Sequence, residues 1–411
     1  MFLKFPEKFY WGSATSSHQV EGNNHNDWSE WEKKNANRLS QIAHLPDYIL
    51  NNYPNPLQKE NYISGPACGH YNKFKEDFDI AKSLGQNAHR FSIEWSRVEP
   101  EEGKFNEKEI EHYRQVIIAL KERGIEPFVT LWHWTNPIWL KNKNGWQSKK
   151  IVFYFRRYVE KIVGSFANEI KFWIMLNEPE IFAANSYLRG KWPPQEKSLI
   201  SYFKTTQNLI AAHKSAYKII KTINPQAQIG IAKNNVYFEP HKNNPVNLTL
   251  KKFIDWWWNF YFLNKIKNEQ DFVGLNYYFH NLINWGFNKN ENKETNDMGM
   301  EIYPEGIYHV LKDLKKYNKP IYITENGLAN AKDEKREKFI KEHLRWVHRA
   351  AEQGIDVRGY FYWSLLDNFE WDKGFWPRFG LIEIDYKTME RKIRKSALSY
   401  AEICKNNGFE I

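Results

Sequence analysis

Cysteine is scarce in this sequence of 411 residues, which contains only Cys68 and Cys404, far apart along the chain. A disulfide framework needs several cysteines at short spacings, and a zinc site needs a local cluster of cysteine or histidine ligands. The sequence has neither pattern. We therefore expect no disulfide framework and no metal site.

Long apolar runs and linkers are also missing. No stretch is long and apolar enough to span a bilayer, and the first residues, MFLKFPEKFYWG, lack the apolar region of a signal peptide. We therefore expect a cytoplasmic protein with no membrane partner. No segment rich in Pro, Gly or Ser divides the chain, so we predict a single domain over residues 1–411.

The charge balance is basic, with 59 Lys and Arg against 49 Asp and Glu, a net charge of +10. The lysines are spread through amphipathic stretches, and no arginine-rich patch or basic tail stands out. Nucleic-acid binding therefore rests on net charge alone and is a distant alternative, which salt-sensitive retention on DNA would test.

Aromatic residues make up 17% of the chain, with 18 Trp. This abundance favours a sugar site, because the C–H faces of pyranose rings stack on indole.

Short β-rich apolar runs alternate with longer amphipathic stretches, a pattern typical of βα units. Helices are expected at 71–84, 108–123, 151–167, 199–223, 304–317, 334–353 and 391–405, and the polar segments 38–65 and 281–297 are expected as surface loops. The alternation predicts an α/β fold, a closed (β/α)8 TIM barrel with long βα loops. The eight expected strands are Phe9–Gly12, Ala88–Ser92, Glu126–Leu131, Phe172–Leu176, Gln228–Ala232, Phe272–Leu275, Ile321–Thr324 and Gly359–Trp363.

Polar and aromatic side chains follow most of the expected strands at the carboxyl end. Active sites of (β/α)8 barrels lie on that face, so these residues should ring one mouth. They are Gln19 and Glu21, His133 and Trp134, Asn177 and Glu178, Asn276 to Tyr278, Glu325, and Trp363 with Glu370 and Trp371. The run 256–258, three consecutive tryptophans, is interpreted as core or as the wall of a subsite.

Glu178 and Glu325 should face each other across this mouth, since they follow the fourth and seventh strands. Hydrolysis of a glycosidic bond needs such a pair of carboxyl groups. One protonates the departing oxygen, and the other attacks the anomeric carbon or activates water. A lone Glu at a strand end is more often a salt-bridge partner, but two on opposing strands are harder to explain in that way.

The sequences around these residues resemble those of family 1 glycoside hydrolases. The matching motifs are FYWGSATSSHQVEG at 9–22, HRFSIEWSR at 89–97, LNEPE at 176–180, YITENGL at 322–328 and WSLLDNFEWDKGF at 363–375. The resemblance implies a (β/α)8 barrel that cleaves terminal β-linked glucose, galactose or fucose with retention and without a cofactor. The implied partner is a small-molecule β-glycoside or oligosaccharide.

The resemblance also implies roles for single residues. By motif, Glu178 resembles the general acid/base and Glu325 the nucleophile, while Arg90 and Tyr278 resemble the partners of the nucleophile. Trp363 resembles the stacking platform beneath the sugar. The residues that resemble the clamp on the terminal sugar are Gln19, His133, Asn177, Glu370 and Trp371. Trp134 and Asn276, which follow the third and sixth expected strands, are also expected to bind the substrate.

Two positions depart from the family pattern. Many members have Trp directly after NEP, where this chain has Glu180, and many have a further Trp where this chain has Met300. Both positions usually line the leaving-group side, so we expect an altered leaving-group site with Glu180 accepting hydrogen bonds from hydroxyl groups.

Glu370 bears on whether the bound sugar is phosphorylated. A carboxylate and a phosphate repel each other, so Glu370 argues for an unphosphorylated sugar.

The sequence therefore predicts an exo-acting, retaining β-glucosidase or β-galactosidase. One alternative is an enzyme of the same fold that transfers the sugar to an acceptor other than water. Another is a sugar-binding protein that has lost catalysis, although such a loss usually replaces one of the two glutamates, and both are present.

Overall fold

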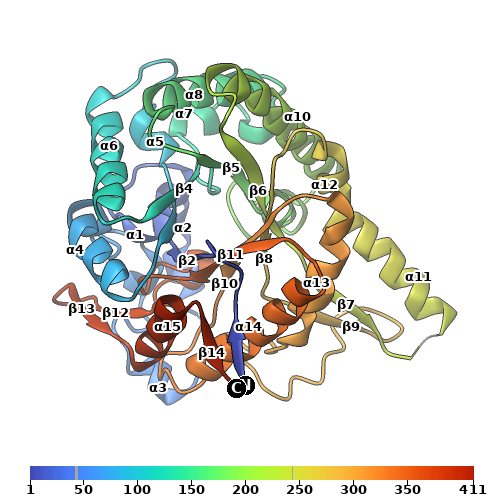
Figure 1. Cartoon of the computed structure of the whole chain (residues 1–411). Helices are drawn as coiled ribbons and strands as arrows, with labels where there is room; N and C mark the ends of the chain where they lie inside the picture. Colours follow the sequence, from blue (N-terminus) through green and yellow to red (C-terminus); the bar gives the residue numbers. More distant parts are fainter. Residues whose placement is uncertain (42–44, 243) are drawn as a thin grey trace.

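A computed structural model describes residues 1–41, 45–242 and 244–411 of the chain. Within these residues, parallel strands close into a barrel in the order β10–β11–β2–β3–β4–β5–β6–β8 (Figure 1). The barrel strands are β2 (Tyr10–Ala14), β3 (Ala88–Ser92), β4 (Glu126–Thr130), β5 (Phe172–Asn177), β6 (Gln228–Asn234), β8 (Val273–Asn276), β10 (Ile321–Asn326) and β11 (Val357–Trp363).

Helices surround the barrel on the outside, as Figure 1 shows. Local chemistry sets several of their ends. The Ser198 side chain accepts a hydrogen bond from the Ser201 amide at the start of α10, and Gly85 and Gly124 adopt positive φ just past α4 and α6. The main outer helices are α4 (His70–Ser83), α6 (Glu107–Glu122), α8 (Ile151–Phe166), α10 (Leu199–Ile223), α12 (Tyr261–Ile266), α13 (Glu305–Leu314), α14 (Arg336–Glu352) and α15 (Lys395–Asn406).

Side chains fill the barrel interior below the mouth. Phe128 and Phe172 stack with ring centroids 4.1 Å apart, and Tyr322 and Phe361 contact Phe128 edge-on. Gly230 leaves room for the ring of Phe272, which a Cβ at that position would meet at 2.4 Å. Among the described residues the barrel is thus a packed core and not a pore, and ligands of such barrels bind at the mouth.

Additional elements lie in the connections between the barrel strands and the outer helices. They are α1 (Ser17–Val20), α2 (Asp27–Leu39), α3 (Asp47–Leu50), η1 (Lys59–Tyr62), α5 (Trp95–Val98), α7 (Ile138–Lys141), η2 (Gly145–Gln147), α9 (Pro179–Ala183), η3 (Ala184–Leu188), β7 (Tyr237–Pro240), α11 (Pro245–Ile254), η4 (Asp255–Phe260), β9 (His280–Ile283), η5 (Lys315–Tyr317), η6 (Trp371–Lys373), β12 (Ile382–Asp385) and β13 (Glu390–Ile393). Near the chain ends, β1 (Phe2–Lys4) pairs antiparallel with β14 (Gly408–Glu410).

The predicted barrel is confirmed, and each expected strand overlaps an observed one. The helix expected at 391–405 begins only at Lys395, because Glu390–Ile393 pairs with β12 in a hairpin. The segments expected as loops hold short elements, α3 and η1 in one and most of β9 in the other; residues 42–44 of the first lie outside the described residues. Over the described ranges, no helix is both long enough and apolar enough to cross a membrane.

Candidate active site

The carboxyl ends of the barrel strands enclose a cavity of about 230 Å³. Residues from β5 and β10 and from the connections after β2, β4, β8 and β11 line it together. Of the predicted site residues, the lining includes Gln19, His133, Trp134, Asn177, Glu178, Tyr278, Met300, Glu325, Trp363, Glu370 and Trp371. Arg90 and Asn276 lie behind this wall and bond to its carboxyl and amide groups.

Glu325 is held by two strong donors. Nη1 of Arg90 donates to its Oε1 at 2.6 Å, and the hydroxyl of Tyr278 donates to its Oε2 at 2.8 Å. Burial raises the pKa of Tyr278 well above its ordinary value, so the phenol keeps its proton and stays a donor. With Arg90 and Tyr278 both donating, both oxygens of Glu325 accept, as those of an ionised carboxylate do. The backbone after Glu325 is tightly packed: a Cβ on Gly327 would lie 1.8 Å from the Trp363 carbonyl oxygen, so glycine is required there.

Glu178 directly follows β5 and has a left-handed backbone conformation, with φ 39°. The next residue, Pro179, disfavours the right-handed helical region for Glu178 and starts α9. The side-chain amides of Asn234 and Asn276 both donate to Oε1 of Glu178, at 3.1 and 2.9 Å. No donor among the described residues bonds to the other oxygen, Oε2, which is therefore the oxygen left to carry a proton.

A chain of hydrogen bonds joins the two carboxyl groups. Arg90 donates to Glu325 through Nη1 and, through Nη2, to the side-chain oxygen Oδ1 of Asn177 at 2.7 Å. The same Asn177 oxygen accepts from Asn276, whose amide also donates to Glu178. Residues of four strands, β3, β5, β8 and β10, therefore form one network that fixes the positions of the Glu178 and Glu325 carboxyl groups.

The environment separates the two carboxyl groups electrostatically. Burial raises the pKa of Glu178 to about 8, and the nearby charge of Glu325 adds to the effect. Burial also raises the pKa of Glu325, but Arg90 and Tyr278 oppose it. Near neutral pH this arrangement favours a protonated Glu178 beside an ionised Glu325, which is the division between acid and nucleophile that glycosidic cleavage needs.

Aromatic rings and polar groups form the rest of the wall. His133 lies between Trp363 and Trp371, with centroids 6.0 and 5.9 Å away. Its Nε2 faces the side-chain amide nitrogen of Asn177 at 3.0 Å, so Nδ1 carries the proton, and burial lowers the pKa of the ring well below its ordinary value. Nδ1 has no protein partner within the described ranges. It remains free to donate to a ligand.

Gln19 and Glu370 meet at the far side of the wall, where the Gln19 amide donates to the Glu370 carboxyl at 3.3 Å. The Trp134 indole donates to the Asn177 carbonyl at 2.8 Å, so this side chain supports β5 as well as lining the cavity. Burial raises the pKa of Glu370 to about 8, with the charge of Glu325 contributing.

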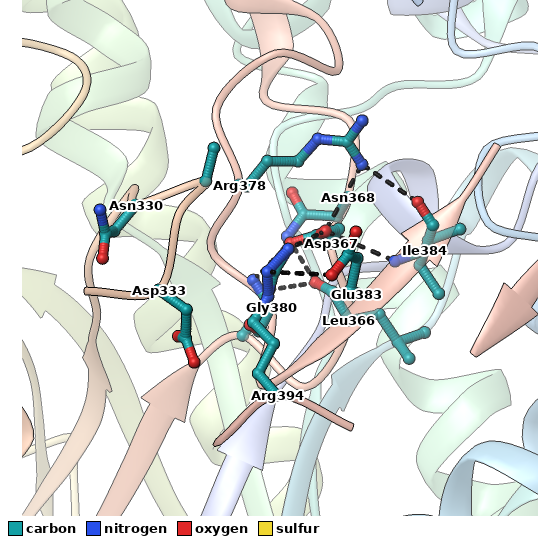
Figure 2. Close-up of polar contacts among 12 residues, drawn as sticks. Asn330, Asp333, Leu366, Asp367, Asn368, Arg378, Gly380, Glu383, Ile384 and Arg394 are labelled. Atoms are coloured by element: carbon teal, nitrogen blue, oxygen red, sulfur yellow. Dashed lines mark hydrogen bonds and ion pairs between the residues drawn. The ribbon is translucent and has the colours of Figure 1, made fainter. Parts of the chain in front are cut away.

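The loop that carries Glu370 is anchored by a buried carboxylate, Asp367, to which the sequence analysis gave no role. Figure 2 shows it surrounded by Arg378, Arg394 and backbone groups. Arg394 donates to Oδ2 at 2.7 Å and the Gly380 amide to Oδ1 at 2.9 Å. Its side chain is fully buried, and this network fixes the start of the loop between Trp363 and Glu370.

Glu180 does not lie where we expected it. It is 6% exposed, does not line the cavity, and its Oε1 accepts from Nζ of Lys233 at 2.7 Å. The attraction of this buried ammonium holds the carboxylate against β6 and not in the cavity wall. Met300, by contrast, does line the cavity. Lys233 and Asn234 were both absent from the expected site.

A second cavity of about 340 Å³ adjoins the first and shares Ile181, Arg189, Asn234 and Phe279 with it. Trp258, the last of the three consecutive tryptophans, lines this second cavity, whereas Trp256 is 48% exposed on the surface. The expectation of a subsite wall thus fits Trp258 and not Trp256.

A barrel mouth with two unlike carboxyl groups and aromatic walls defines a glycoside hydrolase. Comparison with known proteins places the chain more narrowly. The model of glycosyl hydrolase family 1 matches residues 2–265 and 263–409. Beta-glucosidase A of Thermotoga maritima is 35% identical, over 99% of this chain and 99% of its own, and the beta-galactosidase of Sulfolobus acidocaldarius is 29% identical, over 99% and 96%.

Solved structures agree with this placement. The beta-glycosidase from Pyrococcus horikoshii superposes with a TM-score of 0.89 at 38% identity and covers 100% of this chain and 97% of its own. The Thermotoga maritima beta-glucosidase in complex with glucoimidazole gives a TM-score of 0.87 at 34% identity, with coverage of 99% and 100%. The chain belongs to glycosyl hydrolase family 1 and is an O-glycosyl hydrolase.

Proposed function

We propose that this protein is an exo-acting, retaining β-glycosidase that removes a terminal, unphosphorylated β-glucosyl or β-galactosyl residue from a small glycoside or oligosaccharide. The observation that carries the proposal is the unlike bonding of two glutamates in one cavity. Glu325 accepts at both oxygens from Arg90 and Tyr278, whereas the donors that Glu178 finds among the described residues are two amides, both at one oxygen.

The reaction then takes two steps. In the first, the Glu178 carboxyl donates its proton to the glycosidic oxygen while Glu325 attacks the anomeric carbon, so the leaving group departs as an alcohol and a glycosyl ester forms. In the second, the Glu178 carboxylate takes a proton from water, which attacks the anomeric carbon and releases Glu325. Two inversions at one carbon give net retention.

The site supports a terminal sugar as the bound unit. A cavity of about 230 Å³ suits a single hexose ring better than a continuous glucan chain. Gln19, Glu370 and His133 offer polar contacts to ring hydroxyls, and Trp363 offers a flat apolar face. The relatives named above are a beta-glucosidase and a beta-galactosidase, which supports glucose and galactose as the sugars to test first.

Glu370 supports an unphosphorylated sugar. Neutral or ionised, a buried carboxyl provides no positive charge for a 6-phosphate. Lys373 also lines the cavity, but its ammonium is 3.4 Å from the carboxylate of Asp372. A nitrophenyl β-glucoside should therefore be cleaved much faster than its 6-phosphate.

The test is a panel of nitrophenyl β-glucoside, β-galactoside, β-fucoside and β-glucoside 6-phosphate, with the wild type, Glu325→Gln and the surface control Glu342→Gln. We expect turnover by the wild type and the control and none by Glu325→Gln, because an amide cannot form the glycosyl ester. NMR of the first product should show the β-anomer; an α-anomer would refute retention. Added alcohols measure how much sugar goes to acceptors other than water.

A further inference from the structure

The departure at Glu180 places a buried ion pair next to the acid/base. Glu180 belongs to α9 and Lys233 to β6, and both side chains are almost fully buried. Nζ of Lys233 donates to Oε1 of Glu180 at 2.7 Å and to the carbonyl oxygens of Asn234 and Trp258 at 2.6 and 2.8 Å. Three acceptors match the three N–H donors of an ammonium group, so the lysine is satisfied where it lies.

This pair holds the backbone of Asn234 on both sides. Oε1 of Glu180 accepts from the Asn234 amide at 3.1 Å, and Lys233 donates to the Asn234 carbonyl. The backbone at the end of β6 is thereby fixed relative to α9. From this fixed backbone, the Asn234 side chain donates to Oε1 of Glu178 at 3.1 Å.

We infer that Glu180 and Lys233 are positioning residues for the acid/base: by fixing Asn234 they keep one oxygen of Glu178 occupied by amide donors, so that the proton resides on Oε2 and faces the glycosidic oxygen. The inference rests on the proposed function, because it assigns a role to the acid step of that reaction.

The charges near Glu178 give the inference a distinctive signature. Facing it are Glu325 from β10, Tyr278 after β8, Glu180 from α9 and Lys233 from β6. The charge of Glu180 raises the pKa of Glu178. Lys233 and Glu178 attract each other, so the lysine lowers that pKa. Burial itself raises the pKa of Glu180 and lowers that of Lys233, and each partner's charge opposes the effect.

The experiment compares Glu180→Gln and Lys233→Met, using the pH dependence of kcat/KM. In Glu180→Gln, loss of the negative charge should lower the pKa of Glu178 and move the basic limb of the pH profile to lower pH. In Lys233→Met, loss of the positive charge should raise that pKa and move the basic limb to higher pH. Both variants should lose roughly tenfold or more in kcat/KM on an alkyl β-glucoside and little on a dinitrophenyl β-glucoside, since general acid catalysis contributes ~10²–10⁴-fold only where the leaving group needs a proton.

The matched control is Asp77→Asn, which breaks another buried ion pair, with Arg391, outside both cavities. It should lose stability but keep the wild-type ratio between the two substrates. If Lys233→Met does not fold, Glu180→Gln decides the question alone. Its amide oxygen still accepts the bonds of Oε1 but lacks the charge that strengthens them, so the hold on Asn234 weakens while the fold is kept. Oε2 has no hydrogen-bond partner among the described residues, so its replacement breaks no bond.

Basic limbs that stay in place or move in the same direction, or equal losses on both substrates in a folded variant, would overturn the inference. Failure of the proposed function looks different: Glu178→Ala would then also lose activity equally on both substrates and show no rescue by azide.

Discussion

The strongest single prediction concerns the effect of Glu325 on its partner. Replacing Glu325 with Gln removes a negative charge but leaves Glu178 buried in the same network. The pKa of Glu178, raised to about 8 by burial first and by Glu325 second, should therefore fall. For the ~5.5 Å spacing of retaining glycosidases and an effective dielectric constant of ~20, Coulomb's law gives ~3 kcal/mol, or roughly a hundredfold in the acid dissociation constant.

The change has a mechanistic meaning. Formation of the glycosyl ester neutralises Glu325 just as the substitution does. The fall in the pKa of Glu178 would then convert it from the acid of the first step into the base of the second. In the wild type, kcat/KM should decline above about pH 8 as the free enzyme loses the proton of Glu178.

The assay is a ¹³C NMR titration of side-chain carboxyl groups in Glu325→Gln and in the wild type, with Glu178 assigned by its loss in Glu178→Gln. The control is Glu99→Gln, which removes another buried carboxylate, one that bonds to Arg157 and lines neither cavity. This control should leave the titration of Glu178 in place. A midpoint for Glu178 that stays or rises in Glu325→Gln would refute the electrostatic reasoning.

Three other predictions follow from the same structure. Glu178→Ala should lose ~10²–10⁴-fold on alkyl glucosides and far less on dinitrophenyl glucosides, with azide restoring turnover; steady-state kinetics with both substrates checks this. Because the folded pKa of Glu178 is about 8 and the unfolded value about 4.5, folded protein binds the extra proton between these pH values and loses stability as pH rises. Glu178→Gln should therefore melt higher than the wild type at pH 8 and gain less at pH 5, by calorimetry. Asp367→Asn should cost about 3–5 kcal/mol in the free energy of unfolding, because it leaves Arg394 and Arg378 buried without their carboxylate. Chemical denaturation measures that loss, and one under 1 kcal/mol would contradict the anchoring role.

The barrel could be predicted from the sequence because its signals are local. Apolar runs and amphipathic stretches alternate at short range, and the polar residues that end the strands follow directly in the chain. Glu178 and Glu325 were found in this way, and the structure places both in one cavity.

The remaining parts depend on contacts between distant segments. Glu180 and Lys233 are 53 residues apart, and the expected strand stopped at Ala232, one residue before the lysine. Lysine is seldom fully buried, so nothing local indicates that this one lies in the barrel wall. Asp367 lay inside a recognised motif, but its partners Arg378 and Arg394 come together only through the hairpin of β12 and β13.

The ion pair of Glu180 and Lys233 also limits the routes by which this sequence can evolve. Replacing Glu180 with tryptophan alone would leave the Lys233 ammonium buried without its carboxylate, and losing Lys233 first would leave the Glu180 carboxylate buried without its ammonium. Breaking a buried pair from either side costs about 3–5 kcal/mol, a large part of the ~5–15 kcal/mol that keeps a domain folded. Descendants of this enzyme should therefore keep both residues or exchange both together.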